Sequence, residues 1–325
     1  MAILYSTRCA QEKRFLIGIY MYVKKKYMVM SLYIYACACL GTSLQMRLSL
    51  GPSWHKFFSQ ERYFLTPQGF LLFFTPLEVL ETQNDVMPYF EGYVRSYLGQ
   101  HVNIQCTAGG GFFKKSISQA TDFLSTSPDI LVYLVPEEHD PLLSATIRTI
   151  DLQSGVEWNI KNSALFLNPL LGYAYNQERL RFCFLDIDRS YVLHNIWQGP
   201  YIGLEASLSW APFFMRSFYK WVIGQLHMKM RSHTVPLEFP FIQSSNAPFS
   251  YGTASMLGNI FGFEGSYAFY SCWRVGTRFM YEHYANLKSV PVTSVPQQKN
   301  LFLKVQFERV RWNQLIWLFF LEYMF

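Results

Sequence analysis

Apolar and polar side chains alternate along most of the chain after residue 145. A period of two places one class of side chain on each face of a β-strand. The clearest alternating stretches are 150–160, 202–210, 261–269, 273–282 and 301–308. Each runs for about ten residues, which is the length that a tilted strand needs to cross a bilayer. The pattern therefore predicts a series of membrane-crossing strands, each with one apolar face.

The connections between these stretches differ in length. Short ones at 211–216 and 270–272 alternate with long ones at 232–251 and 286–300. Transmembrane β-barrels have short turns at one end and long loops at the other. Seven or eight strands follow residue 145, so we expect an all-β, antiparallel transmembrane β-barrel of 8–12 strands in total.

The last strand has an apolar or aromatic side chain at every second position, and the chain ends on one of them. The residues concerned are Leu315, Trp317, Phe319, Leu321, Tyr323 and Phe325. This ending resembles the closing strand of bacterial outer-membrane β-barrel proteins, which end in Phe with an aromatic residue two positions earlier. The resemblance implies that positions 317–325 form an assembly signal, that the barrel-assembly machinery is a partner, and that the protein resides in the outer membrane.

The composition agrees with a barrel better than with helical membrane spans. Half of the 325 residues are hydrophobic and only 15% are charged, against about 25% in ordinary soluble domains. A spanning helix needs about 20 consecutive apolar residues, and the longest candidate without a charge is 27–41. Alternation hides the lipid-facing residues of a barrel among polar ones, so no long apolar run is needed.

The N-terminus has the layout of an export signal. A Lys24-Lys25-Lys26 cluster precedes an apolar core that begins at Tyr27, and Ala36-Cys37-Ala38 has small residues at the two positions that a signal peptidase reads. We expect residues 1–38 to be a signal peptide, with Met21 as an alternative start; an uncleaved anchor helix is the other interpretation. Without residues 1–38 the formal net charge falls from +6 to +1, so no nucleic-acid partner is expected.

Residues 39–144 have two interpretations. They form either the front part of the barrel or a small α/β-like subdomain. For the second, 114–125 would be a helix and 130–135 a short buried strand. The Gly109-Gly110-Gly111 run lacks the spacing of a phosphate-binding loop, so we expect a bend or bulge in a strand there. Residues 145–325 supply the remaining barrel strands.

Two details of the strand pattern are less regular. Asn176-Gln177-Glu178 separates two apolar segments of 172–184 and predicts the turn of a hairpin. The alternation also changes phase near Arg309. The polar face of the predicted strands would line the lumen, and small barrels fill their interior with such side chains. The lumen-facing polar residues would be Glu205, Gln225, Lys229, Arg274, Arg278, Glu282, Lys304 and Glu308.

Few residues suggest chemistry. Asp186 and Asp188 share a strand face near His194, and paired carboxylates can bind a cation or share a proton. No further ligand recurs at a fixed spacing, so we expect a polar rim and neither a metal nor a cofactor. Apart from Cys9 and the Cys37/Cys39 pair at the end of the signal, three cysteines remain, at 106, 183 and 272. They could form one disulfide with a spare thiol, form intermolecular cross-links, or be three buried free thiols.

A second resemblance concerns 165–325. The segment Pro200-Tyr201-Ile202-Gly203-Leu204 and the strand pair that follows resemble omptins, the ten-stranded outer-membrane proteases. Gly172-Tyr173 and the 265–285 hairpin occur in a similar order. The resemblance implies a barrel, and it places His233 where that family keeps its catalytic histidine.

The catalytic carboxylates of omptins are not matched. Arg231 stands where the acidic partner of the histidine would be, so the base that activates water would be absent. An omptin-like hydrolase with a degenerate site, using Asp186, Asp188 and His233, is therefore an alternative. The leading hypothesis is a barrel with a structural, adhesive or narrow-pore role; a soluble secreted or periplasmic β-rich protein is the third, and enzymatic activity is not expected from the first or the third.

Overall fold

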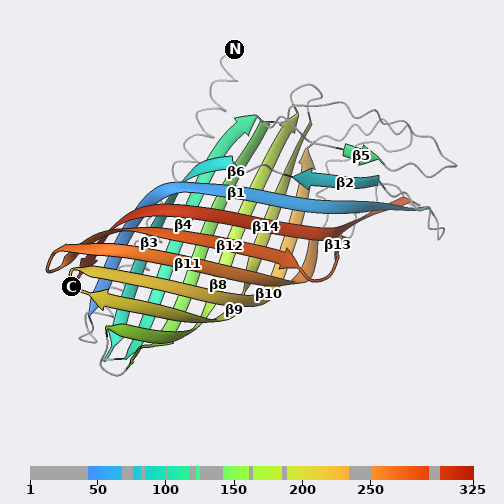
Figure 1. The fold of residues 1–325 in the computed structure, drawn as a ribbon. Helices are drawn as coiled ribbons and strands as arrows, with labels where there is room; N and C mark the ends of the chain where they lie inside the picture. The colour runs from blue at the N-terminus through green and yellow to red at the C-terminus, as the bar shows by residue number, and fades with distance from the viewer. Residues whose placement is uncertain are drawn as a thin grey trace, which may run out of the picture.

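The computed structural model describes residues 43–67, 76–81, 85–99, 101–116, 122–124, 142–160, 164–184, 189–233, 251–292 and 301–325. Within these ranges the chain is all-β (Figure 1). The strands are β1 (Leu44–Pro67), β2 (Pro76–Glu81), β3 (Asp85–Leu98), β4 (Val102–Ser116), β5 (Asp122–Leu124), β6 (Leu142–Val156), β7 (Trp158–Asn159), β8 (Leu165–Phe184), β9 (Arg189–Trp210), β10 (Phe213–His233), β11 (Tyr251–Tyr270), β12 (Trp273–Asn286), β13 (Val290–Val292) and β14 (Leu301–Met324).

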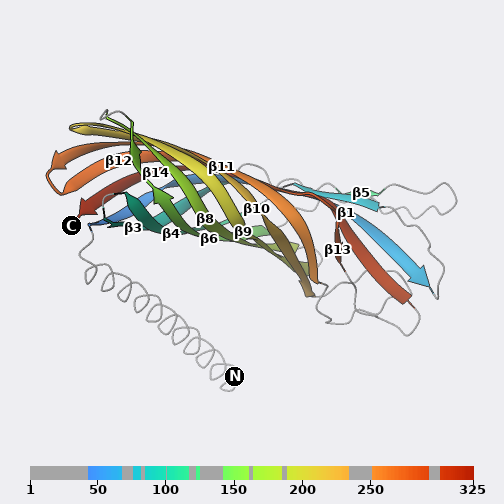
Figure 2. The same cartoon turned by 90° about the horizontal axis from the view of Figure 1, so that it is seen from below.

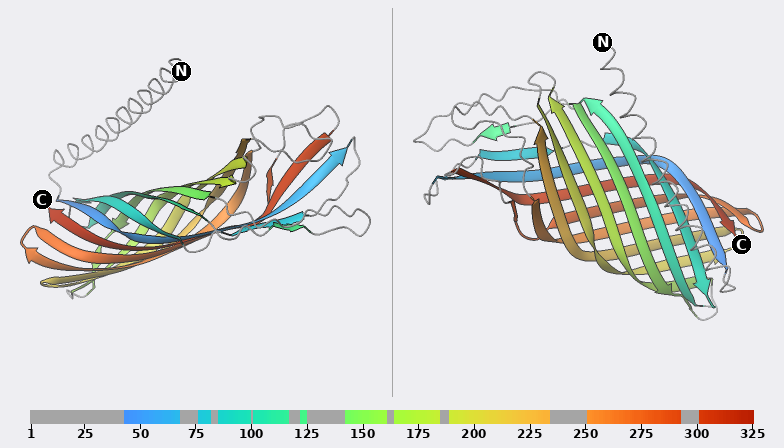
Figure 3. Two further views of the ribbon diagram at one scale, coloured as in Figure 1. Left: turned by 90° about the horizontal axis from the view of Figure 1, so that it is seen from above. Right: turned by 180° about the vertical axis from the view of Figure 1, so that it is seen from behind.

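Ten of these strands form a closed antiparallel barrel. The order around it is β1-β3-β4-β6-β8-β9-β10-β11-β12-β14, and β14 pairs with β1 to close the ring (Figure 3). Closure leaves no free sheet edge around the barrel, which is what a sheet needs in order to cross hydrocarbon. The predicted antiparallel barrel of 8–12 strands is confirmed.

The closing seam joins the two longest strands, because β1 and β14 have 24 residues each. Gly51 lets them approach, since a Cβ at this position would lie 1.9 Å from the backbone oxygen of Trp317. The register shifts once, between Gln60 and Glu61 opposite Glu308. This irregularity accounts for the change of phase predicted near Arg309.

The two ends of the barrel differ. Tight turns at 211–212 and 271–272 and the C-terminus lie at one end. At the other end β1 and β14 continue past the ring and pair with β2 and β13, and β5 pairs with β2 (Figure 2). We call these the turn end and the extended end.

Three sequence-based expectations about local structure are wrong. β8 is continuous through Asn176-Gln177-Glu178, because Asn176 and Glu178 point into the polar lumen and Gln177 outward. The glycine run 109–111 pairs with β3 and β6 without a register shift, so it forms no bulge. Residues 114–116 belong to β4 and 122–124 to β5, not to a helix; residues 117–121 and 130–135 lie outside the described ranges.

Candidate functional site: the lumen and the outer wall

The turn-end half of the lumen is crossed by buried ion pairs. Arg47 on β1 and Arg216 on β10 both donate to Oε2 of Glu264 on β11, at 2.6 and 2.7 Å. Arg278 on β12 donates to Glu91 on β3 at 2.5 Å. These side chains are almost fully buried. Arg216 and Glu264 are register partners on neighbouring strands. The pairs Arg47–Glu264 and Arg278–Glu91 each join strands that lie three places apart in the ring, so they cross part of the lumen.

A second group of charges extends this network toward β9. Arg95 on β3 lies 3.0 Å from Glu205 and 2.6 Å from Glu157. Asn168 on β8 donates to the same Glu205 oxygen at 3.2 Å. Removing one partner of a buried pair typically costs about 3–5 kcal/mol, because the other charge is left uncompensated. The network therefore holds the lumen in one arrangement.

The middle of the lumen is occupied by mixed polar and aromatic groups. Lys220 on β10 pairs with Asp151 on β6, and the Tyr201 hydroxyl donates to Asp151 at 2.6 Å. Asn176 on β8 donates to the Tyr284 hydroxyl on β12 at 2.7 Å. Glu282 lies beside this bond, 3.4 Å from the Asn176 amide nitrogen. Aromatic rings thus fill the space between the polar links.

Toward the extended end the lumen becomes apolar. His55 Nε2 on β1 lies 2.6 Å from Glu178 Oε1 on β8, and Asn195 donates to Glu178 at 2.9 Å. Around and beyond this link lies an apolar plug of fully buried side chains. Its larger members are Phe57, Leu180, Leu193, Trp197, Leu226, Met228, Met256, Phe307 and Trp312. Small barrels are filled by side chains in this way, so the plug closes the lumen.

The outer wall carries large apolar side chains that are exposed. They occur on all ten barrel strands, and Leu48, Phe319 and Trp210 are between 59% and 75% exposed. Aromatic residues gather at the turn end, where Trp273 packs edge-on against Tyr323, and Tyr323 against Phe325. An apolar outer band with aromatic residues at its border is the surface that a bilayer requires of a barrel.

Polar side chains replace apolar ones on the outer wall nearer the extended end. Here Gln198 donates to His227 at 3.0 Å and His283 to Asn313 at 2.5 Å, each between neighbouring strands. We call this belt the collar. Its outward residues include Lys56, Arg148, Gln177, Arg179, Gln198, Gln225, His227, Lys229, His283, Arg311 and Asn313. The change from band to collar marks the upper limit of the apolar surface.

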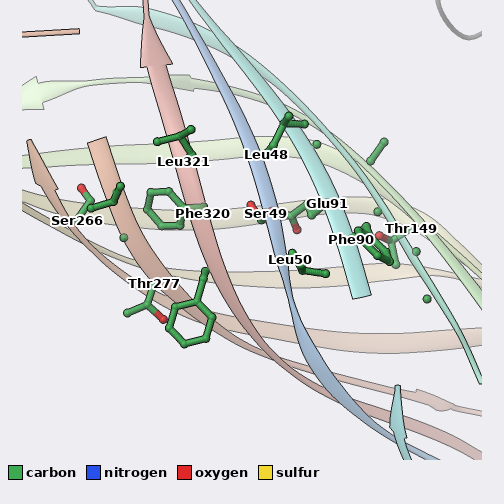
Figure 4. A pocket seen from close by; sticks show the side chains of 18 of the residues that line it. Leu48, Ser49, Leu50, Phe90, Glu91, Thr149, Ser266, Thr277, Phe320 and Leu321 are labelled. Atoms are coloured by element: carbon green, nitrogen blue, oxygen red, sulfur yellow. The ribbon is translucent and has the colours of Figure 1, made fainter. Parts of the chain in front are cut away.

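The outer wall also has a hollow of about 1760 Å³. Figure 4 shows Leu48 and Leu50 of β1, Phe90 of β3 and Leu321 of β14 along it. Its lining is mainly apolar and comes from eight neighbouring strands, from β6 through the seam to β10, with two residues from β8 and one from β9. The hollow lies within the outer band, and Glu91, whose carboxylate pairs with Arg278 in the lumen, is one of its lining residues.

The structure places some predicted lumen residues inside the barrel. Glu205, Arg278 and Glu282 are buried in the lumen, and Arg274 points inward beside Glu322 at 3.6 Å. Glu308 stands at the register shift and is partly exposed. The side chain of Lys304 lies outside the described part of the chain. The outward residues of the segment predicted to be an assembly signal, from Trp317 to Phe325, belong to the apolar band.

Two predicted lumen residues lie on the other face. Gln225 and Lys229 point outward, because the even-numbered residues of β10, from Arg216 to Met228, point inward. The prediction assumed that polar side chains face the lumen along the whole strand. Beyond the band this rule reverses: the inner face meets the apolar plug and the outer face meets water or headgroups.

The residues proposed for a degenerate hydrolase are not brought together by the described coordinates. Asp186 and Asp188 lie outside the described ranges. The backbone of His233 pairs with that of Ser190, the second residue of β9, and the side chain of His233 is not described. His194 is instead held by Gln177 at 2.6 Å. Cys106 and Cys272 are free thiols on the described chain, and the side chain of Cys183 is not described.

Sequence reasoning missed the largest part of the lumen network. Arg47, Glu91, Arg95 and Arg216 were not assigned to any site, and neither was the His55–Glu178 link. A usable signal was present for β1, because Arg47 and Ser49 alternate with the outward Leu48 and Leu50. Within the described ranges no group of His, Cys, Asp and Glu has a geometry suited to a metal ion, and no helix is long and apolar enough to cross a membrane.

Comparisons with known proteins agree on architecture. No family model matches the chain, and no curated protein matches its sequence. The outer membrane protease OmpT from Escherichia coli is similar in structure, with a TM-score of 0.58 and 11% identity over 87% of this chain and 97% of OmpT.

Two more distant matches are also outer-membrane barrels. The translocator domain of autotransporter NalP from Neisseria meningitidis has a TM-score of 0.36 and 8% identity, over 90% of this chain and 97% of the domain. A Pseudomonas aeruginosa FadL homologue has 0.33 and 7%, over 86% and 90%. The similarity to OmpT shows the fold alone: this chain has the closed ten-stranded antiparallel barrel of bacterial outer-membrane proteins, and its similarity to omptins is weak.

Proposed function

We propose that this protein is an outer-membrane β-barrel with a closed lumen, which anchors and presents the segments at its extended end outside the cell. It would be inserted by the barrel-assembly machinery through β14, and outer-membrane lipid would surround the apolar band. Its role is structural or adhesive, and it is not an open diffusion channel.

One observation carries this proposal. The charged residues Arg47, Glu91 and Glu264 are buried inside the barrel, whereas residues such as Leu48 and Phe319 are exposed outside it. A water-soluble sandwich has the opposite arrangement, with apolar faces meeting in a dry core. Contiguous apolar surface over all ten barrel strands is stable only when hydrocarbon covers it.

The closed lumen argues against a general pore. Ion pairs cross the lumen in the turn-end half. The apolar plug, which includes Phe57 and Phe307, fills the extended-end half. The interior of this ten-stranded barrel is filled by side chains. A water-filled channel needs a wider barrel, with more strands. The conductance of the inserted protein should therefore be close to that of protein-free membrane.

Two measurements on the full-length protein test the proposal. Insertion predicts retention in the membrane fraction after carbonate washing and a shift in gel mobility on heating. Closure predicts no stepwise conductance in planar bilayers, with the same preparation shown to be inserted. Extraction by carbonate would contradict the membrane assignment, and stable conductance steps from inserted protein would contradict the closed lumen.

A further inference from the structure

One lysine lies among the arginines of the lumen. Lys220 on β10 is buried and points inward, whereas the other lysine or arginine side chains that form ion pairs inside the described part of the barrel are all arginines. The guanidinium of an arginine stays charged, but the amine of a lysine can act as a nucleophile. Lys220 therefore brings to the lumen a reactivity that the arginines lack.

The amine of Lys220 meets an oriented carboxylate. Its Nζ contacts Oδ2 of Asp151 on β6, and the other oxygen, Oδ1, accepts a hydrogen bond from the Tyr201 hydroxyl at 2.6 Å. Because β8 and β9 separate β6 from β10 in the ring, the contact crosses part of the lumen. A donor on Oδ1 lies where negative charge would develop if a nucleophile attacked the carboxyl carbon. The site thus aligns a nucleophile, an electrophilic carbon and a polarising donor.

Water is largely excluded from the lysine. The side chain of Lys220 is 2% exposed. Its Nζ lies 4.8 Å from the centre of the Tyr201 ring and 5.3 Å from that of the Phe218 ring. Joining an amine to a carboxylate releases water, and a dry site protects the product from hydrolysis. The side chain of Asp151 is 20% exposed, which leaves room for the departing water molecule.

A second buried carboxyl group faces this pair. Glu282 on β12 lies in the same row of register partners as Lys220, since Lys220 pairs with Ile260 and Ile260 with Glu282. It interacts electrostatically with both Lys220 and Asp151. Among the described residues Glu282 forms no ion pair, and its hydrogen-bond donor is the Asn176 amide at 3.4 Å. A carboxyl group in this position can take a proton from one atom and return it to another.

We infer that Lys220 and Asp151 condense into an isopeptide bond, with Glu282 as the proton carrier. The Nζ lone pair attacks Cγ of Asp151 after the ammonium gives up a proton, and the bond from Cγ to Oδ2 breaks. Two protons from Nζ leave with Oδ2 as water, and Glu282 carries the second of them and is regenerated. An ammonium and a carboxylate thus become an amide and one water molecule, without any oxidant, reductant or co-reactant.

The bond would tie β6 to β10 inside the barrel. It would also close the chain between residues 151 and 220 into a loop, and a cross-link of this kind restricts the unfolded chain. The inference depends on the geometry of the lumen and not on the proposed role of the protein.

Peptide mass spectrometry of the full-length protein tests the inference. The heat-induced gel shift first establishes that each preparation is folded, and the protein is then denatured and digested with trypsin. Cleavage next to the lysines and arginines at 148, 161, 216 and 229 releases residues 149–161 and 217–229. In the natural protein we expect one branched peptide that contains both segments and is lighter than their sum by one water molecule.

Two lysine variants provide the comparison. Lys220→Arg keeps the positive charge but has no amine to form the bond, so we expect no branched peptide. Lys229→Arg is the matched control, because it makes the same exchange at an outward lysine of the same strand, and it should keep the branched peptide. Glu282→Gln should slow formation of the bond by about 100-fold or more, as followed by the branched peptide after refolding from urea of protein produced as inclusion bodies.

Separate peptides from the folded natural protein would overturn the isopeptide bond, as would loss of the branched peptide in Lys229→Arg. An unchanged rate in Glu282→Gln would overturn the role of Glu282 as proton carrier. Each of these results leaves membrane insertion and the closed lumen intact, because carbonate washing and conductance measure those separately.

Discussion

The lumen and the outer wall of this barrel obey opposite rules for the same kinds of side chain. Inside, arginine and glutamate are buried against one another, as Arg216 and Glu264 are at 2.7 Å. Outside, leucine and phenylalanine are exposed in the band, and among the described residues the outward charges gather in the collar. Burial of a charge is stable where a partner compensates it, and exposure of apolar surface is stable where the solvent is lipid. The molecule is thus organised by two different solvents.

Glu264 provides the sharpest way to break the lumen side of this comparison. Glu264→Gln would leave Arg47 and Arg216 buried without their shared carboxylate, so we expect a loss of about 3–5 kcal/mol in unfolding free energy. The measurement is the urea dependence of the heat-modifiable gel form. Glu157→Gln is the control, since Glu157 is partly exposed and its loss should cost less than half as much. Equal effects would contradict a special role for the central network.

Phe261→Arg tests the outer wall. Phe261 is exposed in the middle of the band, and an arginine at the bilayer midplane destabilises a barrel by about 2–4 kcal/mol. Gln225→Arg, in the collar on the neighbouring strand β10, should cost about 0–1 kcal/mol because the penalty falls near the interface. Folding into vesicles at increasing urea concentrations measures both. A band variant as stable as the collar variant would show that lipid does not cover Phe261.

The His55–Glu178 link joins the closing seam to the opposite wall. His55→Phe should cost about 1–3 kcal/mol, because the buried Glu178 carboxylate loses a polar partner. Glu178→Leu combined with His55→Phe should recover part of that loss, since two apolar groups replace both partners. The coupling energy from the double-mutant cycle measures the link. Additive losses would mean that His55 and Glu178 act independently.

Lys229→Ala should have the smallest effect. Lys229 points outward in the collar, and surface substitutions usually change stability by no more than about 0.5 kcal/mol. Lys220→Ala, nine positions earlier on the same strand, removes the buried partner of Asp151 and should be clearly more harmful. The same urea titration compares the two. A loss at Lys229 as large as that at Lys220 would return Lys229 to the lumen.

The architecture could be predicted from the sequence because apolar and polar residues alternate: apolar side chains lie on the outer face of each strand and polar ones on the lumen face. The alternation places Trp317, Phe319 and Leu321 on one face, and that face belongs to the apolar band. The prediction failed where polar side chains no longer face the lumen. Lys229 lies past the band, where outward means polar, and Asn176 lies in a strand whose polar residues were read as a turn.

The network in the lumen was harder to predict. Alternation states which face a residue occupies, but not which residue lies opposite it across the barrel. Arg47 and Glu264 are separated by 217 positions and meet only because the ring closes. Partner assignment therefore required the register of all ten strands.

The most direct test of the two-solvent account is a nitroxide scan of β10 from Arg216 to Lys229 in vesicles, on a background with native cysteines replaced by serine. The account predicts that labels at even positions are shielded from both oxygen and a water-soluble nickel reagent. Labels at Tyr219, Trp221 and Ile223 should be reached by oxygen alone, and labels from Gln225 to Lys229 at odd positions by nickel. Nickel access at Tyr219, Trp221 and Ile223 would contradict it.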